Sequence, residues 1–320
     1  MADIELSVVA PMFNEEENIS RTISKINLEM ADFSKKWELI LVNDGSTDNS
    51  LEVCSLFQDK QKNMKVITYS SNRGRGYALR KGIDNSSGKY TITIDFDLSY
   101  DANHITKIYN TLISNESPDA VIGSPYMKGG KTIGVPLIRL LISKLSNRFF
   151  SFFSPKNIKT NTCVLRGYKS SVIKSLELRS DDKELHLEIL SKLFSVGYVV
   201  KEIPAILKTR KGGSTKFNFT KFFKTHLEYS LYDRPAGLFG LLGFLFLFSG
   251  LSLVVFLLYL FSNEQLNPVR PLINATVVLL LIGLQLLVFS VVTFQITNLQ
   301  KEIILIQTQN NKINNKNENN

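Results

Sequence analysis

The sequence predicts an α/β domain with a mainly parallel sheet, followed by interfacial helices and a two-helix transmembrane hairpin. Short apolar runs alternate with helical patterns through the first part of the chain, as in a parallel sheet covered on both faces. Two uncharged apolar stretches, Ala236–Phe261 and Pro271–Leu299, follow. A helix as long as the first stretch reaches about 39 Å, more than the roughly 30 Å of a bilayer's hydrocarbon core. The alternative is a hairpin buried in a large soluble domain.

Polar clusters follow three of the predicted strands. Strands are expected at Glu5–Ala10, Glu38–Val42, Lys65–Tyr69, Tyr90–Ile94, Asp119–Ile122 and Tyr198–Ile203, with helices at Glu16–Met30, Asp48–Gln61, Gly76–Asn85 and Glu184–Val196. The clusters are Asn14-Glu15, Asn43–Ser46 and Asp95–Asp97. Because ligands of such sheets bind beyond the carboxyl ends of the strands, we expect the three clusters to form one site.

The chain divides by composition into a domain, an interfacial segment, a hairpin and a tail. We expect a catalytic domain at 1–215, an interfacial helix at 216–235, spans at 236–261 and 271–299, and a polar, disordered tail at 300–320. Ile133–Phe153 and Phe217–Tyr232 mix apolar and basic residues at helical spacing, which is typical of helices that lie on a membrane surface.

The net charge of +9 belongs almost entirely to the residues before the hairpin. That excess suits an anionic membrane face or a phosphate-bearing substrate, whereas no nucleic-acid module is recognisable, so nucleic acid is not an expected partner. Two cysteines give no disulfide framework and favour a reducing compartment. We therefore expect a two-span membrane protein whose catalytic domain and C-terminus are cytoplasmic. The hairpin could also join copies of the chain into a homo-oligomer.

Asp95-Phe96-Asp97 is the strongest candidate for chemistry, since it directly follows an apolar strand. Two carboxylates one residue apart at a strand end can both turn toward one Mg²⁺ or Mn²⁺ ion, which also accepts diphosphate oxygens. A solvated turn with a helix cap is the plain structural alternative.

Three further segments suit a nucleotide or a phosphate. Asp44 could accept hydrogen bonds from the N–H groups of a base such as uracil or guanine, or serve only in a turn and cap. Asn72–Gly76 is read mainly as a tight loop, with Arg73 and Arg75 beside a diphosphate. Arg210–Lys216 combines cations with glycines and suits a phosphate, or a basic linker attracted to anionic headgroups.

Together these segments resemble the polyprenyl-phosphate glycosyltransferases, the inverting family 2 enzymes that include dolichol-phosphate mannose synthase. The resemblance covers roughly residues 5–235 and also rests on Val9–Glu15, Gly123–Gly130, Leu187–Leu190 and Glu202–Pro204. There are departures from the family pattern. Pro125 stands where mannose synthases usually have Arg, Phe13 stands in for Tyr, and Thr162–Tyr168 replaces the usual motif.

The resemblance implies a nucleotide-sugar-binding domain of the glycosyltransferase A type. It also implies metal-dependent, inverting transfer of a hexose, mannose or glucose, from a nucleotide-diphosphate sugar to dolichyl or undecaprenyl phosphate in the bilayer. The residues implicated are Pro11, Phe13, Glu15 and Asp44 for the nucleotide, Asp95, Asp97 and Ser99 for the metal, and Arg139, Ser143, Arg210 and Lys216 for the phosphates.

Two other functions fit the sequence. One is a membrane glycosyltransferase with a different lipid or glycan acceptor, and the other is a catalytically inactive adaptor of the same fold. The basic segment Arg210–Lys216 favours a phosphate acceptor, and the intact Asp44, Asp95 and Asp97 favour an enzyme.

Overall fold

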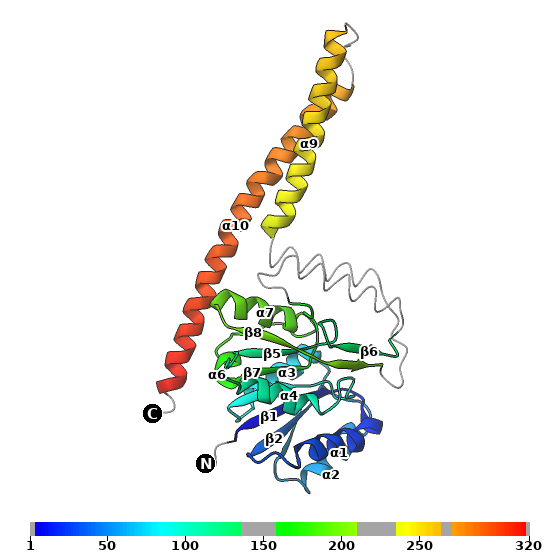
Figure 1. Ribbon diagram of the computed structural model, residues 1–320, viewed down its shortest axis with the longest axis vertical. Coiled ribbons are helices and arrows are strands. Elements are labelled where there is room, and N and C mark those ends of the chain that lie inside the picture. The colour runs from blue at the N-terminus through cyan, green and yellow to red at the C-terminus, as the bar shows by residue number, and fades with distance from the viewer. Residues whose placement is uncertain (1–3, 136–157, 210–234, 264–270, 318–320) are drawn as a thin grey trace. The chain divides into compact units, whose positions relative to one another are not determined.

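The computed structural model divides the chain into two compact units (Figure 1). One consists of Met1–Thr215 with Ile304–Asn320, and the other of Lys216–Ile303. The structure describes residues 4–135, 158–209, 235–263 and 271–317.

The first unit is built on a seven-stranded sheet in the order β3-β2-β1-β4-β7-β5-β8. Its strands are β1 (Leu6–Met12), β2 (Trp37–Asn43), β3 (Met64–Thr68), β4 (Tyr90–Thr93), β5 (Ala120–Ser124), β7 (Arg166–Lys169) and β8 (Val200–Pro204). All pairings are parallel except those of β7, which runs antiparallel between β4 and β5. A small parallel pair, β6 (Lys131–Ile133) with β9 (Ile206–Lys208), stands apart. The predicted mainly parallel sheet is confirmed.

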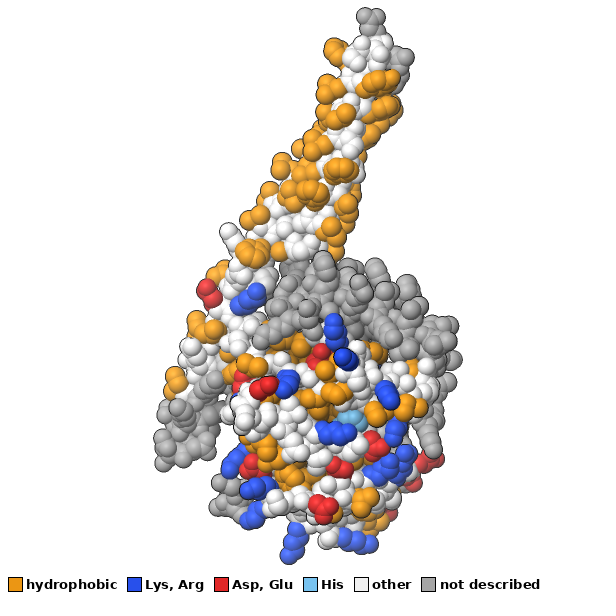
Figure 2. Space-filling model, viewed as in Figure 1, with side chains coloured by type: hydrophobic (Ala, Val, Ile, Leu, Met, Phe, Trp, Pro, Cys, Tyr) orange, Lys and Arg blue, Asp and Glu red, His pale blue; other side chains and the backbone are white. Residues whose placement is uncertain are grey.

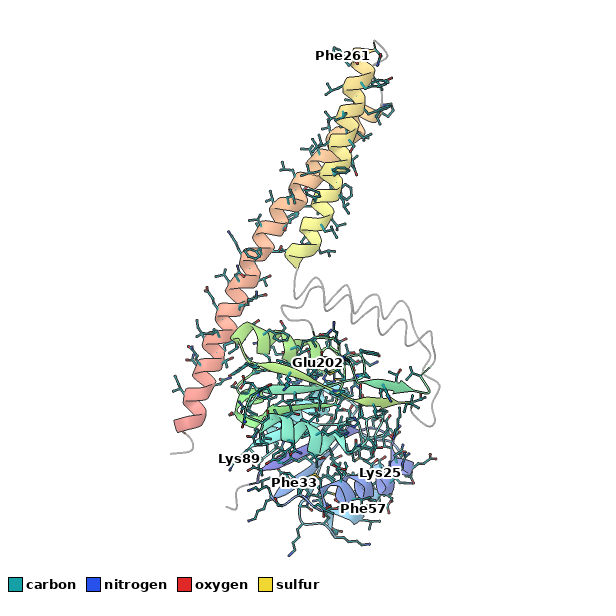
Figure 3. All side chains as sticks on the ribbon, in the orientation of Figure 1. Lys25, Phe33, Phe57, Lys89, Glu202 and Phe261 are labelled. Carbon is teal, nitrogen blue, oxygen red and sulfur yellow. The ribbon has the colours of Figure 1, made fainter. Side chains whose placement is uncertain are left out.

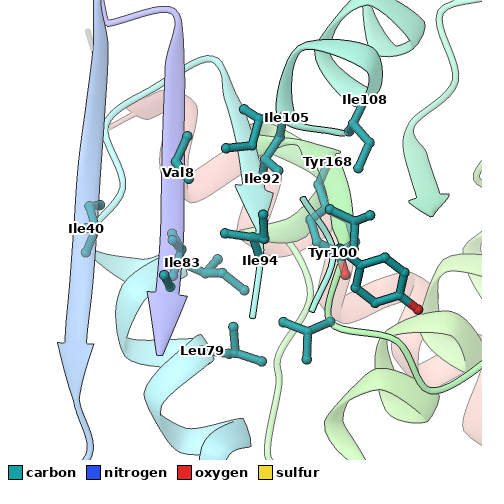
Figure 4. Packing of buried hydrophobic residues seen from close by; sticks show 14 of the residues in the cluster. Val8, Ile40, Leu79, Ile83, Ile92, Ile94, Tyr100, Ile105, Ile108 and Tyr168 are labelled. Atoms are coloured by element: carbon teal, nitrogen blue, oxygen red, sulfur yellow. The ribbon is translucent and has the colours of Figure 1, made fainter. Parts of the chain in front are cut away.

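Helices cover both faces of this sheet. They are the short η1 (Glu16–Asn18), then α1 (Ile19–Met30), α2 (Ser50–Gln58), α3 (Arg75–Asp84), α4 (His104–Leu112), α6 (Ser170–Ile173) and α7 (Leu185–Val196). Gly82 of α3 lies so close to Val9 of β1 that a Cβ there would come within 2.3 Å of the valine side chain. On the other face, Ile108 of α4 lies over Gly167 of β7 beside Ile92 of β4. Figure 4 shows side chains of both helices packed with those of β1, β2 and β4 in the buried core.

Strands β7 and β6 of this unit differ from the sequence-based expectation. β7 was not expected, because its sequence Arg166-Gly167-Tyr168-Lys169 is not an apolar run; the strand forms because both of its edges pair with neighbours. Ile133, predicted to begin a surface helix, ends strand β6 instead. The rest of that predicted helix, and the predicted interfacial helix Phe217–Tyr232, lie outside the described residues.

The second unit contains the predicted apolar hairpin. Its helices are α9 (Pro235–Ser262) and the first part of α10 (Pro271–Asn317). Both are long and apolar enough to cross a membrane, and only 11% and 6% of their most apolar windows are buried. Hydrophobic side chains cover the surface of these helices, and Phe261 near the end of α9 projects outward (Figures 2 and 3).

Glycines bring the two hairpin helices into backbone contact. A Cβ on Gly283 of α10 would lie 2.7 Å from the backbone nitrogen of Leu247 and 3.1 Å from the carbonyl oxygen of Gly243. Further along the same two helices, where Gly240 lies against Ser290, the Ser290 hydroxyl donates a hydrogen bond to the carbonyl oxygen of Ala236, at 2.7 Å. Small residues thus let the helices approach as they do in transmembrane pairs.

The tail expected to be disordered is helical in the structure. α10 continues past Leu299 to Asn317, because the apolar residues Ile303–Ile306 extend its helical pattern. Its last turns belong to the first unit, where Thr308 is buried and the Asn311 side-chain amide donates to the carbonyl oxygen of Ser175, at 3.2 Å.

Candidate active site at the carboxyl ends of the strands

The three polar clusters meet at one edge of the sheet. β2, β1 and β4 are neighbours and run parallel, so their carboxyl ends lie side by side. Asp44 follows β2, Phe13–Glu15 follows β1, and Asp95–Asp97 follows β4. The juxtaposition expected from the sequence is therefore present.

The Asp95–Asp97 turn presents two carboxylates, and Oδ1 of each contacts a neighbouring residue. Asp95 Oδ1 lies 3.4 Å from Nη1 of Arg75, and the two side chains are 22% and 34% exposed. Asp97 Oδ1 accepts the backbone N–H of Ser99 at 2.9 Å and also the Ser99 hydroxyl. Ser99 therefore orients Asp97, and the positive φ of Leu98 closes the turn between them.

The donor atoms at this turn suit a divalent cation. Carboxylate oxygens are the hard ligands that Mg²⁺ and Mn²⁺ prefer. Within the described part of the chain, no group of three or more His, Cys, Asp or Glu residues could hold a metal. An ion on Asp95 and Asp97 would therefore complete its coordination with water or with oxygens of a bound ligand, as Mg²⁺ does at substrate phosphates.

Asp44 is buried and organises the loop that follows β3. Its Oδ1 accepts the hydroxyl of Tyr69 at 2.7 Å and the backbone N–H of Arg73 at 2.9 Å, and its Oδ2 accepts the N–H of Gly74 at 3.1 Å. Burial, followed by the hydrogen bond to Asp44, raises the pKa of Tyr69 far above its usual range, which keeps the phenol a donor. These three donors occupy most of the acceptor capacity of one carboxylate.

The other residues predicted to bind a nucleotide lie at or just after the carboxyl end of β1. Pro11 is buried within the strand, opposite Val42 of β2. Phe13 is 42% exposed at the strand end, where a large apolar ring is available to a ligand. Glu15 is buried, and its carboxylate accepts the Asn18 side-chain amide at 2.7 Å.

A segment distant in sequence covers the loop before α3. A Cβ on Gly74 would meet the carbonyl oxygen of Asp181 at 2.4 Å, and one on Gly76 would meet that of Asp182 at 2.5 Å. The N–H of Tyr77 donates to the same Asp181 oxygen at 3.0 Å. The glycines are thus needed for close packing, and the backbone N–H groups of Arg73, Gly74 and Tyr77 are used inside the protein. This packing could not be predicted from the sequence, because about 100 residues separate the two segments.

A second feature that the sequence did not reveal lies beneath this edge. Arg166 is fully buried, and its guanidinium donates to the carbonyl oxygens of Cys163, His186 and Asn161 at 2.6–2.9 Å. His186 is buried as well, and neither ring nitrogen has a hydrogen-bond partner among the residues that the structure describes. Burial, with smaller contributions from Arg166 and Arg75, lowers the pKa of His186 far below its usual range, so the ring is neutral.

Four predicted phosphate-binding residues are not described by the structure. Arg139 and Ser143 fall within 136–157, and Arg210 and Lys216 fall within 210–234. Their proposed roles stay predictions from the sequence.

Comparison with known proteins identifies the class and then the family. The fold matches crystal structures of glucosyl-3-phosphoglycerate synthase from Mycobacterium tuberculosis. For the complex with Mn²⁺, UDP and glucosyl-3-phosphoglycerate, the TM-score is 0.55 at 17% identity, covering 71% of this chain and 79% of that one. The protein is therefore of the glycosyltransferase A fold. Residues 7–177 match the model of glycosyl transferase family 2, and the chain belongs to that family of enzymes.

Curated relatives extend the similarity to most of the chain. A dodecaprenyl-phosphate galacturonate synthase from Rhizobium johnstonii is 28% identical over 89% of this chain and 85% of its own length. An undecaprenyl-phosphate 4-deoxy-4-formamido-L-arabinose transferase from Salmonella choleraesuis is 28% identical over 80% of this chain and 76% of its own length. The resemblance to polyprenyl-phosphate sugar transferases is thereby confirmed.

Proposed function

We propose that this glycosyltransferase moves a sugar from a nucleotide-diphosphate sugar to a polyprenyl phosphate in a bilayer, with a divalent cation at Asp95 and Asp97. The observation that supports it most is the combination of a carboxylate-lined strand edge with an apolar hairpin on one family 2 chain. The two curated relatives are named for polyprenyl-phosphate acceptors, and the structural neighbour was solved with Mn²⁺ and UDP.

The proposed acceptor requires no dedicated general base. A phosphate monoester has its second pKa near 6, so its oxygen is largely ionised at neutral pH. That oxygen attacks the anomeric carbon and forms the new C–O bond. The bond from this carbon to the diphosphate breaks on the opposite face, and its electron pair leaves with the nucleoside diphosphate. The sugar configuration is inverted.

Different side chains of this protein would bind the metal ion, the nucleotide and the phosphates. Asp95 and Asp97 would hold a Mg²⁺ or Mn²⁺ ion, which neutralises charge on the leaving diphosphate when it is bound. Phe13, Pro11 and Glu15 would line the nucleotide, with Asp44 acting through the loop that it holds. Arg139, Ser143, Arg210 and Lys216 would bind the phosphates, where cations offset the repulsion between acceptor and donor.

The hairpin would place this chemistry at the membrane surface. The excess of basic residues before the hairpin favours an orientation with the catalytic unit and the C-terminus in the cytoplasm. The sugar itself is left to experiment, because the sequence suggests mannose or glucose whereas the relatives are named for galacturonate and a substituted arabinose.

A transfer assay tests the proposal. Membranes containing the protein are given radiolabelled nucleotide sugars, including GDP-mannose, UDP-glucose, UDP-galacturonate and a UDP-aminoarabinose, and lipid is extracted. We expect label in a polyprenyl-phosphate sugar that requires added polyprenyl phosphate and is absent from Asp95→Asn membranes. Efficient transfer to free polyprenol or to diacylglycerol would instead identify a hydroxyl acceptor and overturn the proposal.

A further inference from the structure

Arg75 occupies a fixed position at the proposed metal site. It is the first residue of α3, and its neighbours on both sides are held by other segments. The Asp44 carboxylate accepts hydrogen bonds from the backbone N–H groups of Arg73 and Gly74. The carbonyl oxygen of Asp181 accepts a hydrogen bond from the backbone N–H of Tyr77. The backbone is therefore positioned by β2 and by the segment before α7, so the side chain begins from a defined place beside Asp95.

The Arg75 side chain contacts Asp95, whose carboxylate we propose as a metal ligand. Nη1 of Arg75 lies 3.4 Å from Oδ1 of Asp95, and both side chains are partly exposed. A guanidinium and a divalent cation repel each other even when they contact different oxygens of one carboxylate, because the two charges are then close together. A metal ion on Asp95 therefore weakens the contact between Asp95 and Arg75.

Once its contact with Asp95 is weakened, the Arg75 guanidinium can bind the diphosphate of the donor. An ion on Asp95 is expected to bind the donor through its diphosphate oxygens. A planar guanidinium beside that ion is well suited to the same diphosphate, since Arg pairs with phosphate oxygens through charge-assisted hydrogen bonds.

We propose that Arg75 is a metal-gated ligand of the donor diphosphate. It neutralises Asp95 while the metal site is empty, and it pairs with the diphosphate once Asp95 ligates the ion. The inference rests on the proposed function, because it takes Asp95 as a metal ligand and a nucleotide-diphosphate sugar as the donor. Arg75 thereby makes the metal and the nucleotide bind in a defined order, metal before or together with nucleotide.

The proposal predicts effects of opposite sign from one substitution. Arg75→Met keeps an unbranched side chain of similar length and removes the competing charge. Mn²⁺ alone should bind the variant roughly three- to tenfold more tightly than the wild type. At saturating Mn²⁺, UDP or GDP should bind roughly ten- to a hundredfold more weakly, the effect of losing a charge-assisted phosphate contact. A residue that only supports the fold would weaken both.

The measurement uses the full chain in lipid nanodiscs. Free Mn²⁺ is followed by its electron paramagnetic resonance signal, and nucleotide binding by titration calorimetry with UDP and with GDP. Lys81→Met, which removes a cation from the same helix, is the matched control and should change neither affinity. Arg75→Lys keeps the charge and should leave Mn²⁺ affinity close to that of the wild type.

Asp95→Asn separates failure of this inference from failure of the proposed function. If the wild type binds Mn²⁺, Asp95→Asn does not, and Arg75→Met leaves Mn²⁺ affinity unchanged or reduces it, the metal site stands and the gating role is refuted. If the wild type binds no Mn²⁺, both the metal site and the gating role are wrong. Tighter Mn²⁺ with weaker nucleotide in Arg75→Met supports the proposal.

Discussion

Asp44 shows how one buried carboxylate can hold a whole loop in place beside the candidate active site. Its oxygens fix a phenol and two consecutive backbone N–H groups, which belong to the loop that carries Arg75. These donors are partly buried, and each would lose its partner if the carboxylate were removed. The loss should cost each of them part of the about 1–3 kcal/mol that applies to a fully buried unpaired donor. The carboxylate thus stabilises the site by holding the loop as well as by its charge.

At Asp97, charge and local structure can be separated by one substitution. Asp97→Asn keeps a carbonyl oxygen that can accept the Ser99 N–H, so the turn should persist. Because the charge that we propose to hold the cation is lost, sugar transfer should fall by about a hundredfold or more. EDTA should abolish wild-type activity, and Mg²⁺ or Mn²⁺ should restore it.

Asp101→Asn is the matched control for that measurement. Asp101 lies in the same loop but pairs with Lys208 and Lys25. Its substitution should change transfer little. Full activity in Asp97→Asn would mean that the metal binds elsewhere or is not used.

The buried His104 predicts a dependence of stability on pH. Its Nδ1 contacts the carbonyl oxygen of Asp101 at 2.9 Å, and its Nε2 accepts the N–H of Ile206 at 3.1 Å, which ties β9 to α4. Burial is the main reason that its pKa is lowered below the usual 6.5. The unfolded chain therefore binds a proton more readily, and the free energy of unfolding should decrease as pH falls below about 6.5.

Thermal unfolding of the protein in detergent between pH 7.5 and 5 would measure this decrease. His104→Gln should make the decrease shallower, and His186, whose pKa is lowered in the same direction, should contribute to the part that is left. Identical pH profiles for His104→Gln and the wild type would contradict the assignment.

Individual site residues were only partly predictable from the sequence. Asp95, Asp97 and Asp44 could be located because each follows an apolar strand, and parallel strands bring their ends together. Two contacts could not be predicted: the pairing of Arg75 with Asp95 and the packing of Asp181 on Gly74. Both depend on segments that only the folded sheet brings together.

At the scale of elements, the apolar hairpin depends on glycine at the helix contact. Gly283→Leu would push a side chain against the backbone nitrogen of Leu247, which cannot move aside as a flexible side chain would. Overpacking of this kind costs about 1–3 kcal/mol. We expect a lower midpoint of thermal unfolding in detergent, whereas Val278→Leu, on an exposed position of the same helix, should leave it unchanged. Equal midpoints in the two variants would show that the contact is not tight.

Elements with a continuous apolar pattern were predicted well, and those defined by their neighbours were not. β1 and β2 are buried runs whose positions the sequence showed within one or two residues. β7 contains Arg166 and Lys169 and exists because of its two pairing partners. α10 continues past its predicted apolar stretch, and its last turns are part of the first unit, where Asn311 donates a hydrogen bond to the carbonyl oxygen of Ser175.

At the scale of the whole molecule, the distribution of charge predicts topology. Lys and Arg side chains are concentrated on the α/β unit, whereas apolar side chains cover the hairpin helices (Figure 2). We expect protease added to intact cells to spare the catalytic unit and a C-terminal tag, and a tag at Asn263–Gln265 to be accessible from outside. Labelling of the C-terminal tag from outside would contradict the two-span arrangement.

The antiparallel strand β7 has a consequence for how the chain folds as it is synthesised. β3, β2, β1 and β4 form a continuous block made from the first 93 residues, which can pair while the ribosome is still extending the chain. β5 emerges next, but its partner toward β4 is β7, which is synthesised only after a long intervening segment. The nascent chain therefore carries an open sheet edge at β4 until Arg166–Lys169 has left the ribosome, and the strands that complete the sheet arrive shortly before the hairpin reaches the membrane insertion machinery.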